Sequence, residues 1–169
     1  MPVYVALLRA VNVGGTGKLP MADLKAMCEA IGFKDVRTYI ASGNVVFKSN
    51  LVSAKVQAQL EAKLLAYAGK PVGVHIRTAA EICAVLNSNP FPDALGNRNI
   101  VIFLEAPLPA DAIAKVTGQV DEKIVLGGHE IYVHYGEGMG QSKLKIPAAK
   151  NGTARNINTV AKLAAMTNE

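Results

Sequence analysis

The sequence lacks several features that would point directly to a function. It has no tryptophan, aromatic residues make up 5% of its 169 residues, and only two cysteines occur. Because proteins that read single-stranded RNA stack bases on aromatic side chains, this composition argues against sequence-specific RNA binding. No stretch approaches the roughly 18 uninterrupted apolar residues of a membrane helix, and the N-terminus shows no basic segment followed by an apolar one, as a signal peptide would. We therefore expect a cytoplasmic protein with no membrane partner.

Metal and redox chemistry also find little support in the sequence. Cys28 and Cys83 fall in predicted helices among apolar residues and have no C-x-x-C spacing, so we interpret them as reduced, buried thiols. His75, His129 and His134 have no metal-ligand spacing, and no carboxylate pair is suited to acid–base catalysis. The sequence predicts no metal and no cofactor, and it leaves open whether the protein is an enzyme.

The sequence does have an excess of basic residues. Eighteen Lys and Arg against thirteen Asp and Glu give a formal net charge of +5, which favours an anionic partner such as a phosphorylated metabolite or nucleic acid. Half of the residues are apolar and 18% are charged, a composition that excludes general disorder. The densest basic group lies in the C-terminal third and consists of Lys143, Lys145, Lys150 and Arg155.

The hydrophobic pattern of the first half predicts a ferredoxin-like βαββαβ subdomain over residues 1–78. Strands are expected at 3–10, 36–40, 45–47 and 72–77, and helices at 21–31 and 51–68. Pro20 suits the start of the first helix, and Gly32 and Gly69 suit the ends of the two helices. The order of elements by itself selects the ferredoxin-like arrangement.

A second, related α+β subdomain is predicted over residues 79–169. A helix to about residue 86 begins with a capping box formed by Thr78 and Glu81. A strand at 100–105 and a short helix at 109–116 follow, then a hairpin of strands 123–126 and 130–135, and finally a C-terminal helix at 156–166. The whole chain is therefore expected to be an α+β protein made of two halves with a similar order of elements.

Polar residues and glycines gather after the first strand and in the turn between the second and third strands. In a ferredoxin-like sheet the first and third strands are antiparallel neighbours, so both segments lie at one edge. Glycines let a ligand approach the backbone, and the start of the first helix favours anions. A P-loop is excluded because Leu19 follows Gly17-Lys18. The binding residues expected here are Arg9, Asn12, Gly14, Gly15, Ser42, Gly43 and Asn44.

A second group of candidates precedes the C-terminal helix. Thr153 is expected to cap this helix, which places Arg155 and Asn156 in its first turn. A cation there opposes the helix dipole unless an anion binds it. With Lys143, these residues complete the set of binding candidates.

Several motifs together resemble the DUF1697 family of uncharacterised bacterial proteins. They are the segments 6–15 (ALLRAVNVGG), 37–47 (RTYIASGNVVF), 89–92 (NPFP), 142–144 (SKL) and 153–160 (TARNINTV). The resemblance implies one α/β unit of two ferredoxin-like-related halves and no established activity. Ala10 stands where this family commonly has Gly, and Ile157 where it commonly has Trp. The motifs fall at the three places selected from the residues, which supports a shared cleft.

The main functional hypothesis is a binding module for a small anionic or phosphorylated ligand in a cleft between the two halves. One alternative is an enzyme acting on a nucleotide or sugar phosphate, with Ser42 or Lys143 in a chemical role. The other is a nucleic-acid or protein interaction module that uses the basic C-terminal third, although the few aromatic residues disfavour nucleic acid. The oligomeric state is left open.

Overall fold

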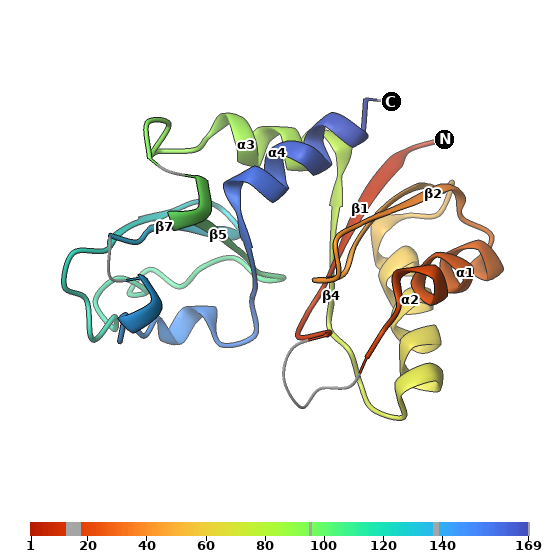
Figure 1. Cartoon of the computed structure of the whole chain (residues 1–169), viewed down its shortest axis with the longest axis horizontal. Helices are drawn as coiled ribbons and strands as arrows, with labels where there is room; N and C mark the ends of the chain where they lie inside the picture. The colour runs from red at the N-terminus through yellow and green to blue at the C-terminus, as the bar shows by residue number, and fades with distance from the viewer. Residues whose placement is uncertain (13–17, 95, 137–138, 169) are drawn as a thin grey trace. The chain divides into compact units, whose positions relative to one another are not determined.

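The computed structural model describes residues 1–12, 18–94, 96–136 and 139–168, and these residues form an α+β fold with two related halves (Figure 1). The chain divides into two compact units. Unit 1 comprises Met1–Ala84 with Lys162–Glu169, and unit 2 comprises Val85–Ala161. No helix in the described part of the chain is long and apolar enough to span a membrane.

Unit 1 contains a four-stranded antiparallel sheet in the spatial order β2-β3-β1-β4. Its strands are β1 Val3–Leu8, β2 Lys34–Tyr39, β3 Asn44–Lys48 and β4 Val74–Thr78. Its helices α1 (Met21–Ile31) and α2 (Ser53–Ala68) cover one face of the sheet (Figure 1). In the middle of the sheet, Val5 pairs with Val46 on one side and with Arg77 on the other. The predicted βαββαβ arrangement is confirmed.

The ends of the unit 1 helices follow from local sequence. Pro20 immediately precedes α1, and Gly32 follows it with a φ of 107°. Gly69 follows α2 with a φ of 73°, and its N–H donates to Leu65 O at 2.9 Å. Glycine is the usual residue at such left-handed helix ends because it has no Cβ. These three boundaries were predicted correctly.

The two helices of unit 1 pack on an apolar cluster that includes Tyr4, Ala6 and Leu8 of β1. Phe47, fully buried on β3, stacks on Phe33 with ring centroids 4.2 Å apart. Burying a side chain of this size contributes about 2–3 kcal/mol. Cys28 belongs to the same cluster, and burial raises the pKa of its thiol to about 12. This thiol is therefore protonated and unreactive, as expected, whereas Cys83 is only half-buried.

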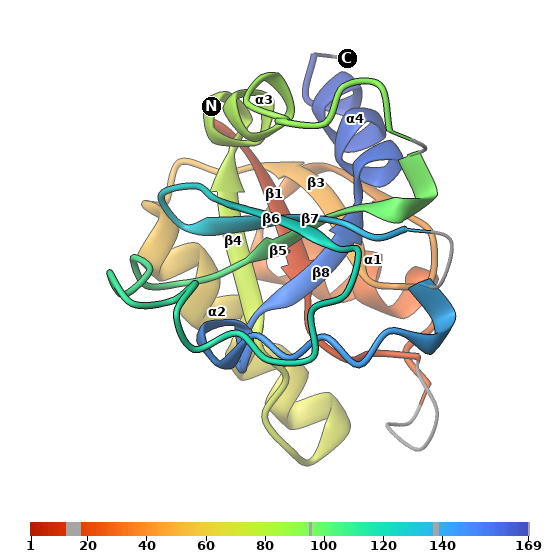
Figure 2. The same cartoon turned by 90° about the vertical axis from the view of Figure 1, so that its left-hand side faces the viewer.

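Unit 2 repeats the sheet of unit 1, with order β6-β7-β5-β8 (Figure 2). Its strands are β5 Asn99–Phe103, β6 Lys123–Leu126, β7 Glu130–His134 and β8 Thr153–Asn156. Val101 takes the central place, pairing with Tyr132 and with Arg155. The remaining elements of the chain are α3 Ala79–Asn87, α4 Ile157–Met166 and the 3-10 helices η1 Gly96–Arg98, η2 Met139–Gln141 and η3 Pro147–Ala149.

The expected helix at 109–116 is wrong, because this segment forms consecutive turns. Ala112 N–H donates to Pro109 O and Val116 N–H to Ile113 O, both over three residues. Only Ala112 of this stretch is buried, and a helix this short is marginal without a packed face. The chain leaves the turns at Thr117, which pairs with Lys145 through two main-chain hydrogen bonds of 3.0 and 2.8 Å.

The expected helix start at 153–156 is also wrong, because these residues form β8. Their pairing with β5 satisfies main-chain groups through contacts some fifty residues away, which local sequence does not encode. The cap of α4 is instead Asn156, whose Oδ1 accepts from Thr159 N–H at 2.9 Å. The capping box of α3 is confirmed, since Thr78 and Glu81 exchange hydrogen bonds of 2.8 and 3.1 Å.

Candidate anion-binding pocket

The segment after β1 and the β2–β3 turn meet at one edge of the unit 1 sheet, as predicted. Leu8 N–H donates to Gly43 O at 2.8 Å. The side-chain amide of Asn12 donates to Ala41 O at 2.8 Å. Of the residues expected at this edge, Gly14 and Gly15 lie outside the described residues.

Asn12 connects the two segments through its side chain. Its Nδ2 also donates to Leu19 O at 2.8 Å, while its Oδ1 accepts from Leu19 N–H at 2.6 Å. Its φ of 56° is one that asparagine tolerates better than most residues. These bonds make Asn12 a brace that fixes the chain before α1. Direct contact between Asn12 and a ligand stays a prediction.

Residues 42–44 make the turn itself. Asn44 is fully buried, and its Nδ2 donates to Tyr39 O and to Ser42 Oγ, both at 2.9 Å. Gly43 has a φ of 92°, and a Cβ placed on it would lie 2.7 Å from Val11 Cγ2. The turn therefore needs glycine for packing and uses Asn44 to satisfy its own backbone. Ligand binding by Ser42, Gly43 and Asn44 stays a prediction.

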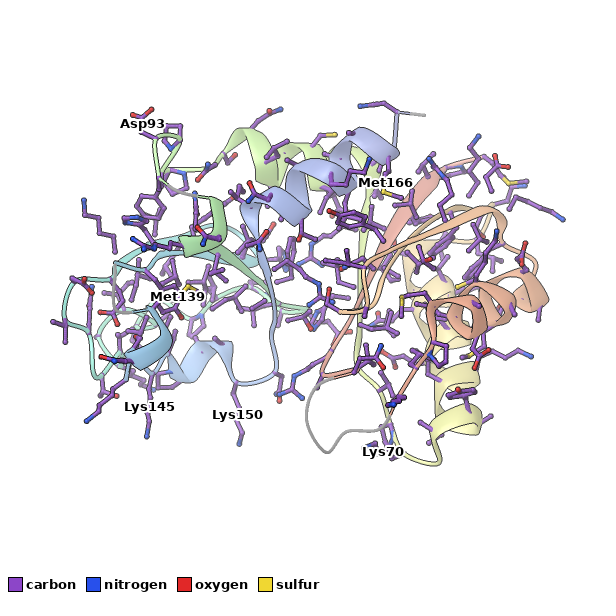
Figure 3. All side chains as sticks on the ribbon, in the orientation of Figure 1. Lys70, Asp93, Met139, Lys145, Lys150 and Met166 are labelled. Atoms are coloured by element: carbon purple, nitrogen blue, oxygen red, sulfur yellow. The ribbon has the colours of Figure 1, made fainter. Side chains whose placement is uncertain are left out.

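Arg9 instead lines a cavity of about 460 Å³ in unit 1. Its N–H donates to Gly73 O at 2.9 Å, which fixes its backbone beside β4. Lys18, just before α1, and Lys70, just after α2, line the same cavity. Figure 3 shows the Lys70 side chain at the end of unit 1 where α2 finishes. Three cations from three separate segments therefore surround one cavity.

Among the described residues that line this cavity, the charged ones are all cations and none is acidic. Tyr67, from the last turn of α2, forms part of the wall, and its hydroxyl donates to Asp23 Oδ2 at 2.9 Å. This hydrogen bond raises the pKa of the Tyr67 hydroxyl, so it stays protonated. Clustered cations with apolar walls raise the local concentration of anions.

Lys143 lies elsewhere, in a cavity of about 530 Å³ in unit 2 that also contains Asp121 and Glu122. Glu122 accepts from Ser142 Oγ at 2.5 Å and from the N–H groups of Val120 and Asp121. These hydrogen bonds, with that of Ser142 the strongest, lower the pKa of Glu122 to about 2.

A carboxylate with so low a pKa is a poor general base near neutral pH. The Ser142–Glu122 hydrogen bond therefore holds this carboxylate in its charged form and ties Ser142 to the turn at 120–122. Within the described residues, no three or more His, Cys, Asp and Glu side chains lie close enough to hold a metal ion.

Lys143 and Lys145 are exposed because the residues that alternate with them, Leu144 and Ile146, pack against an apolar cluster of unit 2. In Figure 3 the side chains of Lys145 and Lys150 extend away from the unit 2 sheet. This row of lysines is the solvated face that underlies the nucleic-acid alternative, which stays a prediction.

Thr153 and Arg155 lie on β8 and are both buried. Arg155 Nη1 donates to Ala154 O at 2.9 Å, and burial lowers its pKa to about 10, so it stays charged at neutral pH. The argument from a cation in a helix's first turn therefore fails, because Arg155 is not in the helix. Arg77 takes the equivalent place in unit 1, and its Nη1 donates to Ile76 O at 3.0 Å.

Comparison with known proteins settles the family. A family model described as "Protein of unknown function (DUF1697)" matches residues 1–132. The chain belongs to the DUF1697 family. The match covers the Met1–Ala84 part of unit 1, the strands β5 and β6 and most of β7, and the motif at 153–160 lies beyond it.

A solved structure supports the same fold for DUF1697. The conserved bacterial protein SP0830 from Streptococcus pneumoniae is similar over 98% of both chains, with 25% sequence identity and a TM-score of 0.82. No curated protein matches. This neighbour supports the fold, and neither its description nor that of the family names an activity.

The structure explains why Gly suits position 10, as the resemblance to DUF1697 implies. Ala10 has a φ of 56°. A side chain at such a φ is strained by about 1–2 kcal/mol, and glycine is not.

Sequence reasoning missed Lys18, Lys70 and Tyr67 as parts of the candidate pocket. The signal for the two lysines was weak. In the sequence, Lys18 follows Gly17 and Lys70 follows Gly69. A glycine by itself predicts only a turn or a helix boundary, not a binding residue. Tyr67 was missed because the apolar pattern of α2, with core residues such as Leu64, predicts a packed helix and does not distinguish a tyrosine that lines a cavity.

Proposed function

We propose that this chain binds a small anionic or phosphorylated ligand in the unit 1 pocket. The supporting observation is that Arg9, Lys18 and Lys70 line one cavity whose described lining residues include no acid. Arginine presents a planar fork that matches phosphate or carboxylate oxygens, and lysine adds a point charge. Asn12 contributes by fixing the position of Leu19, the residue next to Lys18.

The proposal moves the binding site from a cleft between the halves into one half. Of the residues first considered, it keeps Arg9 as a direct contact and Asn12 as a brace. Ser42 and Asn44 serve the adjoining turn. Lys143, Thr153, Arg155 and Asn156 belong to other parts of the chain and are not needed for binding in this pocket.

The test is isothermal titration calorimetry of the full chain with inorganic phosphate, pyrophosphate and methyl phosphate. Arg9→Ala is expected to weaken binding about tenfold or more, since a charge-assisted hydrogen bond contributes roughly 1.5–3 kcal/mol. Lys70→Ala is expected to weaken it as well. Lys25→Ala is the matched control, because Lys25 is an exposed lysine on α1 that does not line the cavity. Equal affinities in all four proteins would contradict the proposal.

Turnover distinguishes binding from the enzyme alternative. Phosphate esters that bind are incubated with the protein and followed by phosphorus NMR. We expect unchanged ester signals, because Ser42 and Lys143, to which the enzyme alternative gives a chemical role, do not line the unit 1 pocket.

A further inference from the structure

The unit 1 pocket is larger than a simple anion requires. A water molecule occupies about 30 Å³ of the liquid, so a phosphate ion with five heavy atoms needs at most about 150 Å³. The cavity holds about 460 Å³, which is within the range of about 300–1,000 Å³ typical of organic ligands. More than half of this volume is left over for another part of the ligand.

The rest of the cavity wall is apolar. Leu19, Leu64 and Val72 contribute to it, with Pro71 beside Lys70. Leu64 and Leu19 are also core residues, so this wall is continuous with the packed interior of unit 1. Such a wall offers no hydrogen bonds and suits an apolar group of the ligand.

Tyr67 gives this wall a flat surface with a fixed orientation. Tyr67 lines the cavity, the residue is 47% exposed, and its hydroxyl donates to Asp23 on the other helix. Because the hydrogen bond restrains the ring, little side-chain freedom remains to be lost when a ligand packs on it. Packing on an aromatic ring increases the affinity of a planar group, and the gain depends little on which planar group it is.

Accepting the proposed function, we infer that the ligand is an organic phosphate carrying a planar apolar group, and that Tyr67 is the residue that selects this group. The three cations hold the phosphate, and the planar group lies on the Tyr67 ring beside Leu64 and Val72. An aryl phosphate or a nucleoside monophosphate has this chemistry.

The experiment compares phenyl phosphate, methyl phosphate and inorganic phosphate by calorimetry at pH 8, where the two esters are dianions. Phenyl phosphate is expected to bind about tenfold more tightly than methyl phosphate, as stacking on an aromatic ring supplies. In Tyr67→Ala this difference is expected to disappear, while the affinity for inorganic phosphate stays the same. Adenosine 5′-monophosphate is expected to follow phenyl phosphate.

Two variants separate the role of the ring from effects on folding. Tyr67→Phe keeps the ring and loses the bond to Asp23, so most of the preference for phenyl phosphate should remain. Leu65→Ala is the matched control, because Leu65 is also 47% exposed on α2 and does not line the cavity. Circular dichroism checks that each variant is folded.

The outcomes are distinguishable. Equal affinities for phenyl and methyl phosphate, both weakened by Arg9→Ala, would overturn this inference and leave the proposed function standing. A preference for phenyl phosphate that survives Tyr67→Ala would overturn the role of Tyr67. If none of the phosphates binds, the proposed function fails and this inference fails with it.

Discussion

The two units share a strand order and differ in what connects the strands. In unit 1 the β1–β2 and β3–β4 connections are the helices α1 and α2. In unit 2 the matching connections are turns and the 3-10 helices η2 and η3. The cavities differ as well. Among the described residues, the unit 1 cavity is lined by three cations and no acid, whereas the unit 2 cavity has Asp121 and Glu122 beside Lys143. One sheet pattern thus supports two connection types whose cavities differ in charge, cationic in unit 1 and mixed in unit 2.

The sheets themselves keep one polar feature in common. Arg77 and Arg155 lie opposite the central valines Val5 and Val101, and each donates to the carbonyl of the residue before it. The strand pairing of the two units is therefore more alike than the connections between their strands. Connections are freer to vary because their backbone groups can be satisfied in several ways.

The largest effect is expected from the hairpin turns. Gly43→Ala places a Cβ 2.7 Å from Val11 Cγ2 at a φ of 92°, so we expect a loss of roughly 3 kcal/mol from strain and overpacking. Gly128→Ala is the matched change in the unit 2 hairpin, where a Cβ meets nothing within 4 Å. Urea denaturation followed by circular dichroism measures both. Equal losses would show that the two turns are packed alike.

A second difference is expected in acid. The folded pKa of Glu122 is about 2, below its ordinary value of 4.5. Stability from its charged form is therefore present above pH 4.5 and is lost as the pH falls from 4.5 towards 2. Glu122→Gln should lower the melting temperature at pH 7 and remove this part of the acid loss.

Unit 1 supplies the control for this titration. Asp35 pairs with Lys48 at 3.0 Å, which lowers the pKa of Asp35, but the Asp35 side chain is 64% exposed. Asp35→Asn should change the melting temperature less than Glu122→Gln at every pH. A larger effect of Asp35→Asn would contradict the comparison.

The loop braces of the two units should respond differently to side-chain removal. Asn12→Ala removes three hydrogen bonds and leaves Ala at a φ of 56°, so we expect a loss of about 2 kcal/mol. Lys145→Ala should be nearly neutral, because the bridge to Thr117 uses main-chain groups only. Amide hydrogen exchange at Leu8 and Leu19 measures the loosening in unit 1. Unchanged exchange in Asn12→Ala would show that the brace is dispensable.

The smallest effect concerns the loops that follow the first strand of each unit. Ala10→Gly relieves a positive φ and should stabilise unit 1 by about 1 kcal/mol. Ala106→Gly, in the loop after β5, should destabilise slightly, since glycine adds freedom to the unfolded chain. Thermal denaturation of both variants measures whether the melting temperature rises, as expected for Ala10→Gly, or falls, as expected for Ala106→Gly. A loss of stability in Ala10→Gly would contradict this explanation.

Much of unit 1 was predictable because its signals are local. Helix α1 follows Pro20 and ends at Gly32, and a 3.6-residue stripe of apolar residues defines the face between them. Unit 2 was less predictable because its structure depends more on contacts between distant residues. The sequence of segment 109–116 favours a helix, but the segment is short and only Ala112 in it is buried. The strand β8 forms through its pairing with β5, some fifty residues earlier in the chain.

The candidate pocket was predictable in part. Arg9 was identified from its position after a strand, and the meeting of its loop with the β2–β3 turn followed from topology. The sequence analysis grouped Arg9 with Ser42 and Asn44, whereas the cations that line the cavity with Arg9 are Lys18 and Lys70. Lys18 and Lys70 are 52 residues apart in the sequence and meet at one cavity only because α1 begins where α2 ends.

The sequence by itself determined the strand order and the helix ends of unit 1, because glycine, proline and apolar spacing act over a few residues. The tertiary structure decided how each polar side chain is used. Asn12 and Asn44 became braces because folding brought main-chain carbonyl and N–H groups within their reach, and buried groups of this kind must be paired. Arg9 lines the cavity with Lys18 and Lys70 because segments distant in the sequence end at the same place.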